Sequence, residues 1–259
     1  MLCKKITEVI EKDYSCRYAL EWDNVGLLVG RDNKEVRRIY IALDATDEAI
    51  DAAVHEKADM LITHHPLIFG GMKRIVSEDF VGRRILKLVQ NDISYYAMHT
   101  NYDVCGMAEL SGVKMGLQNP EVLEVTSDGE EAMGIGQIAD AGREMTLKEC
   151  CRKAKEAFGL ESVKVFGDLE GKVRRVAICP GSGKSVIGIA IEKGADVLIT
   201  GDIGHHEGID SVAQGLAVID AGHYGLEHIF IADMKRYLEE KIENIEVFGA
   251  PISHPFQVI

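Results

Sequence analysis

The chain has 259 residues, of which 46% are hydrophobic and 27% are charged, and its formal net charge is −13. This composition is typical of an α/β globular protein and excludes a disordered or fibrous one. The negative charge argues against nucleic acid as a partner, because an acidic surface repels phosphate backbones. No signal-peptide pattern, apolar run of about 18 residues or Cys-x-x-Cys pair occurs, so we expect a cytoplasmic protein with reduced thiols and no membrane contact.

Two segments of the chain are copies of one pattern. Residues 36–63 and 173–200 align without a gap at an offset of 137, and both begin with Val-Arg-Arg and end with Ala-Asp-x-Leu-Ile-Thr. Self-similarity of this kind, in only two copies, indicates an internal duplication and not a solenoid.

Each copy predicts a strand, a turn, a helix and a second, parallel strand. Third apolar runs follow at 93–100 and 215–223, and helices are expected at 2–18, 78–91, 106–116, 146–158 and 225–242. The pattern predicts an α/β fold of two related halves with mixed or parallel sheets flanked by helices. We place the halves at 1–125 and 126–259, near the acidic stretch 127–131, and leave open whether the C-terminal helix and strand pack back on the first half.

Histidines and carboxylates follow the predicted strands. His64 and His65 come after the second strand of the first copy, and the later pairs His99/Asp103 and His223/Glu227 each have a spacing of four residues. The carboxyl ends of parallel strands are where ligands bind, and imidazole with carboxylate is a transition-metal donor set. The alternative, for His64 and His65 taken alone, is two hydrogen-bonded surface histidines.

Several short motifs resemble a known family, the NIF-three-like dinuclear metal-centre proteins, also described as GTP cyclohydrolase 1 type 2 homologues. The matching segments cover nearly the full length and are 22–27, 43–46, 63–67, 99–103, 200–202, 205–206, 220–227 and 254–256. No long insertion separates the halves, so the chain resembles the short form of the family.

The resemblance implies two divalent transition-metal ions per chain, of Fe, Zn, Mn, Co or Ni, in the cleft between the halves. The implied ligands are His64, His65, Asp103, His223 and Glu227. Five ligands hold two ions only if a carboxylate bridges, and Asp103 and Glu227 are the candidates. Comparison of the two halves adds three residues that we expect to contact either the ligands or the substrate, which are His99, Asp202 and His206.

The resemblance also implies a homohexameric toroid and a metal-dependent hydrolase in which activated water attacks a purine nucleotide such as GTP. Whether the protein is an enzyme stays open, since the alternative is a non-catalytic metal-binding or regulatory protein that acts through metal handling or protein partners. A third reading is a nucleotide-binding P-loop at Gly181–Ser185. Ile178 stands where that motif requires glycine, which argues against it.

Overall fold

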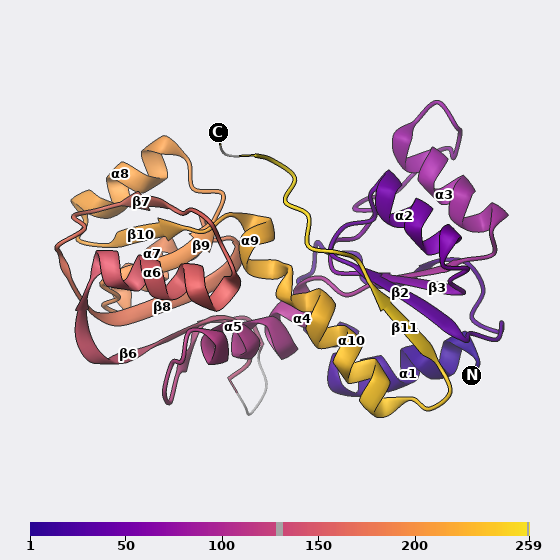
Figure 1. The fold of residues 1–259 in the computed structure, drawn as a ribbon, viewed down its shortest axis with the longest axis horizontal. Coiled ribbons are helices and arrows are strands. Elements are labelled where there is room, and N and C mark those ends of the chain that lie inside the picture. The colour runs from indigo at the N-terminus through magenta and orange to yellow at the C-terminus, as the bar shows by residue number, and fades with distance from the viewer. Residues whose placement is uncertain (128–131, 258) are drawn as a thin grey trace. The chain divides into compact units, whose positions relative to one another are not determined.

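The computed structural model describes residues 1–127, 132–257 and 259. Residues 128–131, which make up most of the acidic stretch, lie outside the described part. The chain forms two compact units, one comprising Met1–Tyr102 and His228–Ser253, the other Asp103–Glu227 and His254–Ile259. Each contains a mixed sheet flanked by helices, which confirms the expected fold class (Figure 1).

The first unit is built on a five-stranded sheet with the order β1-β4-β3-β2-β11. Strand β1 is antiparallel to β4, and the other neighbours are parallel. The elements of this unit are α1 (Cys3–Asp13), η1 (Cys16–Tyr18), β1 (Gly26–Val29), β2 (Arg38–Ala42), α2 (Asp47–His55), β3 (Met60–Thr63), α3 (Phe80–Gln90), β4 (Ser94–Ala97), α4 (Thr100–Tyr102), α10 (Ile229–Lys241) and β11 (Glu246–Gly249).

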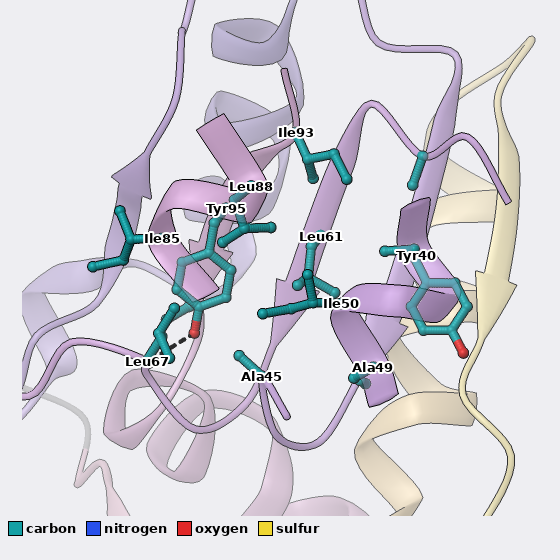
Figure 2. Packing of buried hydrophobic residues seen from close by; sticks show 14 residues of the cluster. Tyr40, Ala45, Ala49, Ile50, Leu61, Leu67, Ile85, Leu88, Ile93 and Tyr95 are labelled. Atoms are coloured by element: carbon teal, nitrogen blue, oxygen red, sulfur yellow. Dashed lines mark hydrogen bonds between the residues drawn. The ribbon is translucent and has the colours of Figure 1, made fainter. Parts of the chain in front are cut away.

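Helices cover both faces of this sheet, which is why its central strands are almost continuously apolar. Alternate strand residues, including Tyr40, Leu61 and Tyr95, pack against α2 and α3 (Figure 2). Tyr96 points to the opposite face, where its hydroxyl donates to Glu11 on α1 (3.1 Å). Helix α10 lies on that second face as well (Figure 1).

The second unit is built on a six-stranded sheet with the order β5-β6-β8-β9-β10-β7. Strands β8, β9 and β10 are parallel neighbours. Strand β6 is antiparallel to both β5 and β8, and β7 is antiparallel to β10. The elements are the π-helical turn η2 (Asp103–Met107), α5 (Ala108–Lys114), β5 (Glu121–Val125), β6 (Gly134–Thr146), α6 (Leu147–Phe158), β7 (Lys164–Phe166), β8 (Lys172–Ser182), α7 (Ile187–Glu192), β9 (Val197–Gly201), α8 (His205–Ala213), β10 (Ala217–Asp220) and α9 (His223–Glu227).

The duplication seen in the sequence extends to the hydrogen bonds of the two sheets. Ile39 pairs with Met60 in the first sheet, and the residues at the offset of 137, Val176 and Val197, pair in the second. The aspartate of each Ala-Asp-x-Leu-Ile-Thr segment accepts two backbone N–H groups from the arginine pair of its own copy. Asp59 accepts from residues 37 and 38 at 2.8 and 3.0 Å, and Asp196 accepts from residues 174 and 175 at 2.7 and 2.8 Å.

Some expected elements differ from the observed ones. The first helix ends at Asp13, and the expected helix 225–242 is two helices, α9 and α10, interrupted at His228. The 13-residue strand β6 was not predicted, because its glycines and polar residues weaken the apolar pattern of a strand. The compact units are interleaved along the chain, because α10 and β11, from the C-terminal part of the sequence, belong to the first unit. The halves 1–125 and 126–259 stay a prediction. In the described residues, no helix is both long and apolar enough to cross a membrane.

The Tyr95 hydroxyl holds the loop that carries His64 and His65. It accepts from the backbone N–H of Leu67 (2.8 Å) and donates to the carbonyl of His65 (3.1 Å). We expect Tyr95→Phe to lower the free energy of unfolding by about 1–3 kcal/mol, because a buried N–H loses its acceptor. Urea unfolding measures the change. Tyr18→Phe, which removes an exposed hydroxyl bonded to Arg17, is the control, and equal effects of the two variants would contradict the assignment.

Candidate metal centre

Three imidazoles converge at the carboxyl ends of two neighbouring strands in the first unit. His64 and His65 follow β3, and His99 follows β4. One ring nitrogen of each lies within 4.8 Å of those of the other two. His64 is fully buried, and the side chains of His65 and His99 are 17% and 14% exposed. This spacing lets the three rings present nitrogen ligands to a common space.

Each of these imidazoles is held by its Nδ1 atom. His64 donates to the backbone carbonyl of Met98 (2.7 Å), His65 to Asp44 (2.7 Å) and His99 to Asp23 (2.8 Å). A carbonyl can only accept, so Nδ1 of His64 must carry the proton, and the carboxylates favour the same tautomer in the other two rings. The lone pair of each neutral ring then lies on Nε2, which is the form of histidine that binds a metal ion.

The second unit gathers carboxylates and one imidazole. Asp103 begins the π-helical turn η2, and His223 and Glu227 occupy the two ends of α9. Nε2 of His223 lies 2.9 Å from Glu227, and its Nδ1 lies 2.7 Å from Asp202. Burial and the negative charges of Asp103 and Glu227 raise the pKa of the Cys179 thiol, so both carboxylates act on one buried position. π-Helical turns are frequent at functional sites.

His223 is held as a cation by the carboxylates on either side. Its burial opposes the charge, but the hydrogen bonds and charges of Glu227 and Asp202 outweigh burial and raise its pKa to about 9. The raised pKa stabilises the fold below the ordinary value of 6.5, and this contribution is lost as the pH rises through about 9. A metal ion and a proton therefore compete for Nε2 of this ring.

Close backbone packing places Glu227 and Asp202. Gly181 has a φ of +81°, and a Cβ there would lie 2.6 Å from a carboxylate oxygen of Glu227. The buried Asp220 accepts from the backbone N–H groups of Ile203 and Gly222, both at 3.1 Å. These bonds fix Ile203, which follows Asp202, and Gly222, which precedes His223. Asp202 itself is in the left-handed region, with a φ of 58°.

The sequence missed the acceptors that orient the rings. Asp44 and Asp23 lie 21 and 76 residues from the histidines that they contact, and the Met98 acceptor is a backbone atom. The only signal was the position of both aspartates within the short motifs.

Asp202 contacts a predicted ligand, whereas His206 packs against His205, with ring centroids 5.2 Å apart. The assigned roles of His99, Asp202 and His206 stay predictions.

The glycine-rich turn does not have the surroundings of a phosphate loop. Gly181 and Ser182 still belong to β8, and the following helix α7 is only six residues long. Lys184 forms an ion pair with Glu207. The close approach of Gly181 to Glu227 gives a structural reason for glycine in this turn.

Two related α/β units, with histidines and carboxylates at the ends of their parallel strands, define an α/β protein whose side-chain clusters can hold metal ions. The model of the Duf34/NIF3 (NGG1p interacting factor 3) family matches residues 1–255, so the chain belongs to this family. The match confirms the resemblance seen in the motifs.

Known relatives agree with this membership. A Clostridium acetobutylicum protein named GTP cyclohydrolase 1 type 2 homolog is 33% identical, over 94% of this chain and 92% of its own length. A protein named NIF3 homolog from Schizosaccharomyces pombe is 31% identical, over 90% of this chain and 87% of its own. The crystal structure of a Bacillus cereus protein related to NIF3 has a TM-score of 0.94 at 27% identity and covers 100% of this chain and 99% of that one.

Asp23 links the imidazole of His99 to the stability of the first unit. Its side chain is fully buried; burial would raise its pKa, but hydrogen bonds from His99 and Thr100 outweigh this and lower the pKa from 3.8 to about 2. The stabilisation is therefore present above pH 3.8 and is lost as the pH falls through about 2. We expect Asp23→Asn to cost about 2 kcal/mol at neutral pH and less at about pH 3, by urea unfolding. A cost independent of pH would contradict this account.

Gly181→Ala tests the packing around Glu227. The added methyl group meets the carboxylate, so we expect a loss of about 1–3 kcal/mol beyond the cost of the positive φ itself. Gly142→Ala is the matched control, because Gly142 has a similar φ of +76° with no atom within 4 Å of the added Cβ. Unfolding free energies of both variants give the comparison, and equal losses would show that backbone strain alone matters.

Proposed function

We propose that His64, His65, Asp103, His223 and Glu227 bind two divalent transition-metal ions and that the protein is a metal-dependent hydrolase. The observation that carries this proposal is the set of Nδ1 hydrogen bonds, which leaves Nε2 of His64 and His65 as the ligand atom. Asp202 gives the Nδ1 atom of His223 the same kind of partner. Carboxylate and carbonyl acceptors of this kind commonly orient metal-bound histidines.

The donor set fits such ions. The three imidazoles of this set, from His64, His65 and His223, and its two carboxylates suit Zn, Fe, Mn, Co or Ni. They disfavour Mg and Ca, which prefer oxygen ligands. A carboxylate shared between the two ions would let five ligands serve both, and Asp103 or Glu227 can fill that role. The side chain of Glu227 is only 3% exposed and already contacts His223. A metal ion would give its charge a second partner and would favour the ionised form of this buried carboxylate.

Divalent ions bound here would supply a hydroxide-like nucleophile from water at neutral pH. The residues of the chain then bind and orient the substrate. His99 lies beside His64 and His65 with Nδ1 held by Asp23, so its Nε2 can accept a proton from a reacting group. The names of the relatives support a purine nucleotide such as GTP as substrate. We further propose a cytoplasmic homohexameric toroid, as the family resemblance implies.

Metal content tests the binding proposal. We expect about two transition-metal ions per chain in protein purified without added metal, and a large loss in His64→Ala and Glu227→Ala. Elemental analysis on correctly folded protein gives the numbers. His55→Ala is the control, because the side chain of His55 is 85% exposed and lies outside the proposed ligand set. Metal-free wild type after reconstitution would refute the site.

Turnover tests the hydrolase proposal separately. We expect metal-loaded protein to convert GTP and the chelated protein to leave it unchanged, since the nucleophile depends on the ions. Chromatography of the nucleotide products measures the conversion. Metal-loaded protein that binds its ions but leaves GTP intact would exclude this activity and favour a non-catalytic role.

A further inference from the structure

Two exposed aromatic rings pack against one imidazole in the first unit. Trp22 and Phe69 are 61% and 57% exposed. The ring centroid of His99 lies 5.8 Å from that of Trp22 and 5.9 Å from that of Phe69, with interplanar angles of 74° and 89°. The three rings form what we call the aromatic subsite.

Hydrogen bonds hold the loops that carry Trp22 and Phe69 in place. Asp23, next to Trp22, accepts from His99 (2.8 Å) and from the backbone and hydroxyl of Thr100. Asn24 donates from Nδ2 to the carbonyl of Ile68 (2.6 Å), the residue before Phe69. The exposed rings are thus presented on loops that hydrogen bonds hold in place, and not on unsupported segments.

An isolated exposed aromatic side chain is common, but two that pack against one half-buried imidazole mark a binding surface. Aromatic side chains carry a large apolar surface, and more than half of Trp22 and of Phe69 is exposed and can contact a flat ligand. The position beside the three histidines makes a small molecule the fitting occupant, because polar groups that converge next to apolar surface are what a ligand site contains.

The charge of the neighbouring loop indicates the chemistry of the ligand. Lys73 and Arg74 follow Phe69 by four and five residues and are exposed. Neither forms an ion pair with another residue of the described chain. Two cations without ion-pair partners, in the loop that carries Phe69, repel a cationic ligand and attract an anionic one, in a chain whose net charge is −13.

We infer that Trp22, Phe69 and His99 bind a flat heteroaromatic ring that carries an anionic group, with Lys73 and Arg74 as the attracting charges. The inference deepens the proposed function by naming the residues that hold the ring, and only its link to hydrolysis rests on that function. Binding to the subsite does not require metal ions.

Trp22 is the only tryptophan of the chain, so its fluorescence reports on this subsite alone. Metal-free protein in a chelator is titrated with GTP, with guanosine and with inorganic triphosphate, and the signal is corrected for ligand absorbance. We expect saturable quenching by GTP, weaker binding of guanosine and no quenching by triphosphate. Quenching by triphosphate equal to that by GTP, or no quenching by GTP or guanosine, overturns the inference.

Calorimetry on variants identifies the residues. Phe69→Leu and Trp22→Leu keep apolar volume but remove a ring, and each should weaken GTP binding by about 10-fold or more. Phe80→Leu is the control, since Phe80 is also 57% exposed but lies at the start of α3 beside Arg84. Unchanged affinity in the first two variants, or fluorescence that follows self-association and not ligand, contradicts the subsite. GTP turnover without quenching would refute the subsite alone, and quenching without turnover would refute the hydrolase alone.

Discussion

The hydrogen bond from Nδ1 of a histidine to a fixed acceptor is the interaction on which the candidate metal centre depends. Without it, an imidazole can rotate and exchange tautomers, and its lone pair has no defined direction. The sheet of the first unit supplies the acceptors, because Asp44 and Met98 follow β2 and β4 on either side of the strand that precedes His64 and His65. Parallel neighbouring strands end at the same edge, so the donors and their acceptors meet there.

The duplicated scaffold carries different chemistry at equivalent strand ends. The residues at an offset of 137 from Asp44 and His65 are Gly181 and Asp202. In the first unit, Asp44, after β2, pairs with His65, after β3, whereas in the second unit Asp202, after β9, pairs with His223, after β10. Gly181 stands at the position equivalent to Asp44, and its lack of a side chain leaves room for the buried carboxylate of Glu227.

The sequence predicted those strands whose burial requires a local run of apolar residues. Strands such as β3 and β9 are apolar on both faces and flanked by turns, and the repeat made their equivalence visible. Strand β6 was missed because antiparallel pairing with β8, and not its own side chains, holds it in place. The addition of α10 and β11 to the first unit is set by tertiary packing. The Nδ1 partners depend on contacts between distant residues, and no local pattern encodes those.

The protonation of the histidine rings tests the account most directly. Long-range nitrogen–proton NMR correlations on metal-free protein, with assignments from single histidine variants, distinguish the two neutral tautomers above neutral pH. We predict that His64, His65 and His99 carry the proton on Nδ1 and leave Nε2 unprotonated, as their bonds to Met98, Asp44 and Asp23 require. Protonation on Nε2 in His64 and His65 would contradict the account, because their ligand atoms would then be blocked.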